Sequence, residues 1–98
     1  MSRRLVFRRQ ALQEIAQAAE WYESHARGLA AEFLRALDAA IASIQRSPEL
    51  FPIVSEKLRR ALLRRFPYSV IYSFSEEEIV IVACAHWRQN PRRWLGRR

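Results

Sequence analysis

The sequence predicts an α+β domain in which a helical hairpin packs on a small, mostly antiparallel sheet. Two observations indicate this fold: two consecutive segments with helical periodicity, and a β-rich C-terminal half. The expected order of elements is β-α-α-β-β-β, followed by a basic C-terminal tail. A chain of 98 residues is typical of a single domain, here expected to span residues 1–98.

The helical half begins after a short β-like segment, RLVF, at residues 4–7. Apolar residues at positions 12, 15, 16, 19 and 22 share one helical face and predict a helix over about residues 9–25. Phe33, Leu37 and Ile41 continue the pattern in a second helix over about residues 29–46. Gly28 is typical of a helix end, and so short a connection favours an antiparallel hairpin.

The C-terminal half reads as strands after a proline-containing loop at residues 47–57. A loosely alternating strand is expected within residues 58–66. In the next strand, alternate residues fall on one face: Tyr68, Val70, Tyr72 and Phe74. The sequence SEEE at residues 75–78 predicts a hairpin turn. Residues 79–85, IVIVACA, are apolar on both faces, which is typical of a central, covered strand.

The charge is strongly positive and unevenly distributed. The formal net charge is +7, yet residues 14–56 carry seven acidic residues against three arginines. Lys57 is the only lysine among 17 lysine and arginine residues. Arginine has a planar fork of donors that matches carboxylates and phosphates, which favours an acidic partner. A genome rich in G and C would also raise the arginine content.

Several functional classes are disfavoured by composition. No apolar run approaches the roughly 18–20 residues that span a bilayer, and the N-terminus lacks the apolar stretch of a secretory signal. The single cysteine, Cys84, cannot form an internal disulfide, which fits a cytoplasmic location. No His/Cys cluster has metal-ligand spacing, so we expect no metal and no cofactor.

Two arginine pairs in the first long strand are candidate binding residues. They are Arg59-Arg60 and Arg64-Arg65, and adjacent strand residues point to opposite faces of a sheet. One member of each pair is therefore expected to reach an acidic partner or the sheet edge. The structural interpretation is salt bridging to the acidic helices, and the functional one is a surface that binds an anion or a partner.

His86 ends the most apolar strand and is a candidate acid or base. RNA cleavage through a 2′-hydroxyl needs a base, an acid and a cation near the phosphate. Glu56, Arg65, Tyr68 and His86 could fill these roles. A structural hydrogen bond from His86 that holds the tail is equally compatible with the sequence.

The tail interleaves Trp87 and Trp94 with arginines. These indoles could stack on nucleobases, anchor a protein interface, or fold back onto the sheet. On the first helix, Trp21 and Tyr22 are typical of a core or its margin, and they could also line a groove for a partner.

The run RRALLRRFPYSVIYSFSEEEIVIVACAHWRQNPRRW resembles the C-terminal half of ParE-type toxins, in the ParE/RelE superfamily of bacterial type II toxin–antitoxin modules and plasmid stabilisation proteins. The FPY step, the hairpin and the spacing of His86, Pro91 and Trp94 carry the resemblance. The WYE sequence at residues 21–23 and the SPELFP loop match the helical half. The resemblance covers almost the whole chain and implies a RelE/ParE-like fold.

The resemblance also implies a mode of action. Such toxins are neutralised by a ParD-like antitoxin whose acidic C-terminal segment wraps the toxin, while its N-terminal half binds the promoter. Direct DNA binding by the toxin alone is therefore not expected. ParE-type members poison DNA gyrase, which makes this chain a binding inhibitor without catalytic residues. The alternative is the RelE-type activity, a ribosome-dependent mRNA endoribonuclease.

This hypothesis assigns residues to two surfaces. The surface expected to bind the target comprises Arg59, Arg60, Arg64, Arg65, His86, Trp87, Arg88, Arg92, Arg93, Trp94 and Arg97. The surface expected to bind the antitoxin comprises Trp21, Tyr22, Phe33, Arg60 and Arg64.

Overall fold

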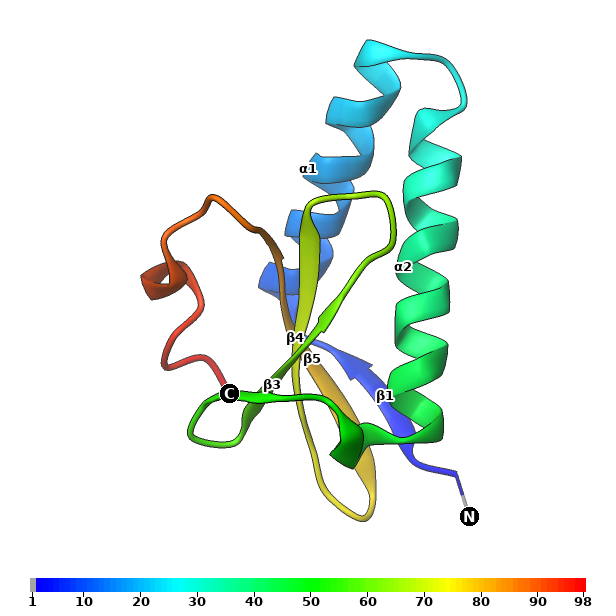
Figure 1. The fold of residues 1–98 in the computed structure, drawn as a ribbon. Helices are drawn as coiled ribbons and strands as arrows, with labels where there is room; N and C mark the ends of the chain where they lie inside the picture. The colour runs from blue at the N-terminus through cyan, green and yellow to red at the C-terminus, as the bar shows by residue number, and fades with distance from the viewer. Residues whose placement is uncertain (1) are drawn as a thin grey trace.

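The computed structural model describes residues 2–98 and shows one sheet with two helices on one face (Figure 1). The elements are β1 (Arg4–Phe7), α1 (Arg9–His25), α2 (Leu29–Arg46), the 3₁₀ turn η1 (Pro48–Leu50), β2 (Ile53–Ser55), β3 (Leu58–Leu62), β4 (Tyr68–Phe74), β5 (Glu78–His86) and the 3₁₀ turn η2 (Pro91–Arg93). The sheet order is β1-β5-β4-β3-β2. Only the β1–β5 pair is parallel. The predicted α+β fold is confirmed, with β2 as an added strand in the expected loop.

The helical hairpin has the predicted bounds. Ile15, Ala19 and Tyr22 of the predicted face of the first helix pack in the core, but the buried face is shifted from the predicted one. Leu12 is 51% exposed, whereas Ala11, Ala18 and Tyr22 are buried. An alanine-rich helix offers several shallow apolar stripes, so periodicity alone does not select the one that packs. Neither helix, within residues 2–98, is long and apolar enough to cross a membrane.

The connection between the helices is stabilised by one carboxylate. Gly28 has φ of 86°, a left-handed conformation that favours glycine. The carboxylate of Glu23 accepts hydrogen bonds from the backbone N–H groups of Gly28 and Ala30, the latter at 3.1 Å. Because these groups belong to the unpaired start of α2, Glu23 caps that helix from the preceding one.

The main core lies between the helices and the sheet. The predicted face of β4 is confirmed, since its alternate residues all pack on this side: Tyr68, Val70, Tyr72 and Phe74. Tyr72 is fully buried, and its hydroxyl donates a 2.7 Å hydrogen bond to the carbonyl of Pro48. This bond ties the loop after α2 to the middle of the sheet.

A β-bulge in β5 changes which side chains face the helices. Ile71 pairs with Ala83 and Tyr72 pairs with Ile81, so Val82 is an extra residue in β5. Before the bulge, Ile81 packs in the main core; beyond it, even-numbered residues take over that face, starting with Cys84. The bulge therefore brings His86 to the side of α1, where its ring lies 5.1 Å from that of Tyr68.

The tail covers part of the opposite face of the sheet. Trp94 is only 8% exposed and packs in a second core with Leu58, Ile71 and Val82. This corrects the expectation that Trp94 binds the target, because its indole is occupied within the protein. The apolar character of β5 on both faces follows from these two cores.

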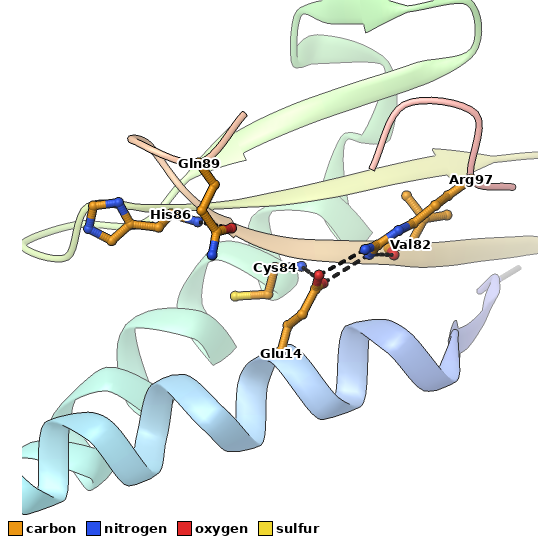
Figure 2. A network of polar contacts seen from close by, with 6 residues as sticks. All are labelled: Glu14, Val82, Cys84, His86, Gln89 and Arg97. Atoms are coloured by element: carbon orange, nitrogen blue, oxygen red, sulfur yellow. Dashed lines mark hydrogen bonds and ion pairs between the residues drawn. The ribbon is translucent and has the colours of Figure 1, made fainter. Parts of the chain in front are cut away.

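Glu14 and Arg97 join α1, β5 and the tail at the bulge (Figure 2). Two N–H···O contacts of 3.0 Å link their side chains, which are only 16% and 15% exposed. The Arg97 guanidinium also donates to the Val82 carbonyl at 3.1 Å, and the Cys84 N–H donates to Glu14 at 3.0 Å. Because β1 pairs with β5 only as far as Ile81, the next part of β5 has no neighbouring strand on that side. The side chains of Glu14 and Arg97 supply hydrogen bonds to its backbone there instead.

Arg97 was expected to bind the target, and the structure corrects this expectation. Its guanidinium is committed to a largely buried ion pair and to a backbone carbonyl. Leaving one half of such a pair without its partner costs more than the pair itself contributes. Arg97 thus holds the tail in place.

We predict that Glu14→Gln lowers the free energy of unfolding by about 2–4 kcal/mol, because Arg97 loses its countercharge in a largely buried position. Urea denaturation measures this change. The control is Glu78→Gln, which breaks the pair with Arg4, a residue 75% exposed, and should cost under about 1 kcal/mol. Equal losses in both variants would contradict a special role for Glu14.

Candidate partner-binding site

Two hollows flank the His86 end of the sheet. The helix-side hollow has a volume of about 510 Å³ and lies between α1, the ends of β4 and β5, and the first turn of the tail. It is lined by Glu14, Gln17, Ala18, Trp21, Tyr22, Pro67, Tyr68, Cys84, His86, Gln89 and Arg93.

The tail-side hollow lies on the opposite face and measures about 260 Å³. It is lined by Arg60, Leu62, Ser69, Ile71, Ala85, His86, Trp87, Gln89, Pro91 and Trp94. His86 and Gln89 line both hollows, because the turn that follows β5 separates them.

Hydrogen bonds hold that turn. The His86 N–H donates to Gln89 Oε1 at 3.2 Å, and the Arg88 N–H donates to His86 Nδ1 at 3.0 Å. Figure 2 shows Gln89 beside the His86 backbone, with the imidazole directed away from the Glu14 network. Of the two roles that the sequence left open for His86, catalytic or structural, the hydrogen bond from Arg88 to the imidazole is of the structural kind.

One thiol and two phenols that line the helix-side hollow, those of Cys84, Tyr22 and Tyr68, stay protonated at neutral pH. Burial, with the nearby Glu14 charge as a lesser cause, raises the pKa of the Cys84 thiol to about 12. Burial also raises the pKa values of Tyr22 and Tyr68, with smaller contributions from Cys84 to Tyr22 and from Tyr22 and Cys84 to Tyr68. A thiol without thiolate character is a poor nucleophile, so these side chains form an uncharged wall.

The alternative catalytic set does not converge. Tyr68 and His86 are paired across β4 and β5, and Arg65 lies in the loop before β4. Glu56 lies in the turn before β3, near the Phe74 end of β4, six residues and roughly 20 Å from Tyr68. The expectation that all four could act together is wrong, because the pairing of β3 with β4 places Glu56 at the other end of the sheet.

Arg59 has a structural role that corrects its assignment to target binding. Its guanidinium donates to the carbonyls of Glu49 at 2.9 Å and Phe51 at 2.7 Å, and it lies 5.5 Å from the Phe74 ring. The expected acidic partners from the helices are replaced by backbone carbonyls. The two carbonyls of this loop accept hydrogen bonds from the guanidinium and so hold Arg59 against the loop.

The other arginines of the two pairs are exposed: Arg60, Arg64 and Arg65. Within residues 2–98, the ion pairs are those of Arg4 with Glu78 and Arg97 with Glu14. In the tail, Arg88, Arg92 and Arg93 are also exposed, and Trp87 is 58% exposed beside them. These side chains make a basic surface around the two hollows.

Phe33 was expected to contact the antitoxin, and this expectation is corrected. Its side chain is fully buried and stacks on Tyr22 at 5.3 Å, so it belongs to the core. Tyr22 is 9% exposed and reaches the wall of the helix-side hollow. Trp21 is 55% exposed at its rim, with its ring 3.8 Å from that of His25.

Among the site residues missed from sequence, three polar ones matter most here: Glu14, Ser69 and Gln89. Glu14 gave a usable signal, because it lies three residues after Ala11 and four before Ala18, on the buried stripe of α1. An acid on an apolar stripe needs a partner. No local pattern marked Ser69 or Gln89.

A helical hairpin on one face of a mostly antiparallel five-stranded sheet defines a toxin fold of the RelE/ParE type. The family model "ParE toxin of type II toxin-antitoxin system, parDE" matches residues 5–91. The chain therefore belongs to the ParE toxin family.

Comparison with solved structures agrees on the fold. A chain from the chromosomal ParDE TA system of P. aeruginosa superposes with a TM-score of 0.73 at 18% sequence identity. The match covers 87% of this chain and 96% of that one. A search of curated sequences finds no match.

We predict that Cys84 resists alkylation in the folded protein at pH 8. Raising its pKa from 9.0 to about 12 leaves about 10³-fold less thiolate, and the side chain is buried. Iodoacetamide labelling followed by mass spectrometry, with urea-unfolded protein as the control, measures the protection. Similar labelling rates in both states would contradict it.

The same pKa shift sets a direction for alkaline stability. Because the folded pKa of Cys84 is raised above the unfolded value, its contribution is complete below about pH 9 and is lost as pH rises towards about 12. Cys84→Ala should therefore reduce the loss of unfolding free energy between pH 9 and pH 11. An unchanged slope would exclude this thiol as a contributor.

Proposed function

We propose that this ParE-family toxin inhibits DNA gyrase by binding, and that a cognate ParD-like antitoxin with an acidic C-terminal segment neutralises it. One observation supports binding above all: exposed arginines surround two hollows and form no ion pair within residues 2–98. Such a basic surface is electrostatically complementary to an acidic partner. Family membership supports the type of partner.

The helix-side hollow fits the antitoxin. Its volume of about 510 Å³ lies within the usual range for a bound group, and Ala18, Tyr22 and Pro67 give it apolar walls. Trp21 at the rim and Arg93 beside it suit a segment that carries both apolar and acidic side chains. The proposed antitoxin surface comprises Trp21, Tyr22 and Arg93 at this hollow, together with two exposed arginines outside it: Arg60, which lines the hollow on the opposite face, and Arg64.

The proposed target surface is smaller than the sequence suggested. It keeps the exposed side chains of the sheet end and the tail: Arg60, Arg64, Arg65, His86, Trp87, Arg88, Arg92 and Arg93. Since three of these arginines also belong to the proposed antitoxin surface, an antitoxin bound there would cover part of the target surface. Neutralisation then follows from competition.

The order of cellular events tests this proposal. The toxin is induced in bacteria without antitoxin, and the synthesis of DNA and of protein is followed by pulse labelling. We expect DNA synthesis to stop first, and purified toxin to block supercoiling by gyrase until antitoxin is added. If protein synthesis stops first, the ribonuclease alternative is favoured.

We predict that Arg88→Gln, Arg92→Gln and Arg93→Gln together raise the toxin concentration needed for half-inhibition of gyrase at least about tenfold, with a folded protein. The matched control replaces three exposed arginines of the helical hairpin and its connecting turn by glutamine: Arg27, Arg35 and Arg46. Both triples lower the charge by the same amount. An equal effect would show that net charge matters and the tail surface does not.

The Tyr68–His86 pair is the observation that keeps a ribonuclease as second candidate. For a binding inhibitor, His86→Ala should weaken inhibition by about 1–3 kcal/mol in binding free energy, the loss from one contact. A catalytic acid or base would lose about 10²–10⁴-fold in rate instead. If the protein cleaves mRNA in a ribosome assay and His86→Ala abolishes this cleavage, the protein is a ribonuclease.

A further inference from the structure

The tail-side hollow is lined by the guanidinium of Arg60 and the hydroxyl of Ser69, and no carboxylate of residues 2–98 lines it. We propose that it receives one acidic side chain of a protein partner, carried on a segment with an apolar residue beside it. This inference rests on the proposed target surface, to which Arg60 and Trp87 belong, and it specifies what chemistry that surface recognises.

Ser69 is the first observation. Its side chain points to the tail side of β4, is only 4% exposed, and lines the hollow. Its hydroxyl makes no hydrogen bond to any other residue of the described part of the chain, residues 2–98. Every fully enclosed side-chain nitrogen or oxygen there has a partner, so this hydroxyl is open to the hollow. Because this hydroxyl faces the hollow from a largely buried side chain, an acceptor on a ligand would replace solvent as its hydrogen-bond partner.

Arg60 is the second observation. It lies on the same face of the sheet as Ser69, one strand away, and is the only charged residue that lines the hollow. No acidic side chain of residues 2–98 forms an ion pair with it. One guanidinium and one hydroxyl are the donors that a single carboxylate accepts, and a charge-assisted hydrogen bond is the stronger kind.

The walls and the size select the kind of ligand. Leu62 and Trp87 are 55% and 58% exposed, while Ile71 and Trp94 form the buried apolar floor. A volume of about 260 Å³ is below the range of small-molecule sites and suits one side chain with part of its backbone. The exposed leucine and indole can cover an apolar neighbour of the acid.

A nucleic acid fits this hollow less well. A polyanion binds through several cations, and here one guanidinium serves the whole hollow. Trp94, the second indole, is packed in the core and leaves Trp87 as the one exposed surface for stacking in this hollow. The remaining tail arginines lie outside it.

The test uses short capped peptides as probes for the ¹⁵N-labelled full chain. Acetyl-Leu-Glu-Leu-amide is compared with acetyl-Leu-Gln-Leu-amide by NMR titration. We expect saturable shifts at the Ser69 amide and the Trp87 indole with the glutamate peptide, and about tenfold weaker binding of the glutamine peptide.

Two pairs of variants make the test specific. Arg60→Gln and Ser69→Ala should weaken binding of the glutamate peptide about tenfold and about threefold. The matched controls, Arg35→Gln and Ser73→Ala, change an exposed arginine of α2 and the next serine on the same face of β4, both outside the hollow, and should stay within about twofold. Equal binding of both peptides, no saturable shift, or tighter binding of AMP at the same residues would overturn the proposal.

The outcome is independent of gyrase. If the toxin leaves gyrase active while the glutamate peptide binds, the proposed target is wrong and the acidic-side-chain site stands. If the toxin inhibits gyrase and the glutamate peptide gives no saturable shift, the acidic-side-chain site is wrong and the proposed target stands.

Discussion

The contact of Glu14 with Arg97 at the bulge of β5 is the constraint on which the rest of the site depends. Glu14 and Arg97 form hydrogen bonds with the Cys84 N–H and the Val82 carbonyl of β5, which lie beyond the last residue that pairs with β1. The same contact holds the end of the tail against α1. The bulge decides that His86 lies on the side of the helices. The fastened tail lets Trp94 complete the second core. Both hollows are consequences of this one arrangement.

Arginine serves two physical purposes in this chain. Arg59 and Arg97 each satisfy backbone carbonyls where the chain turns inward, which a planar guanidinium with five donors does well. Arg60 and its exposed neighbours are left without acidic partners among residues 2–98. Some arginines of this basic sequence thus hold parts of the chain together, and the others form a surface suited to an acidic protein.

The two hollows share the His86–Gln89 turn, so they are not independent surfaces. A ligand that moved this turn on one face would change a wall of the hollow on the other face. The protonated thiol of Cys84 and the phenols of Tyr22 and Tyr68 give the helix-side hollow the character of a receptor wall.

The sequence by itself determined the bounds of α1 and α2 and the alternation of β4, because periodicity and turn residues act over short distances. The resemblance of its motifs to a known family implied the RelE/ParE-like fold. Only the tertiary structure decided which indole is free, which arginine is structural and that Glu56 lies far from His86. Trp87 and Trp94 look alike in the sequence, yet one is exposed and the other is core. The reason is that burial depends on strand register, a bulge and a contact between residues 14 and 97, none of which leaves a local pattern.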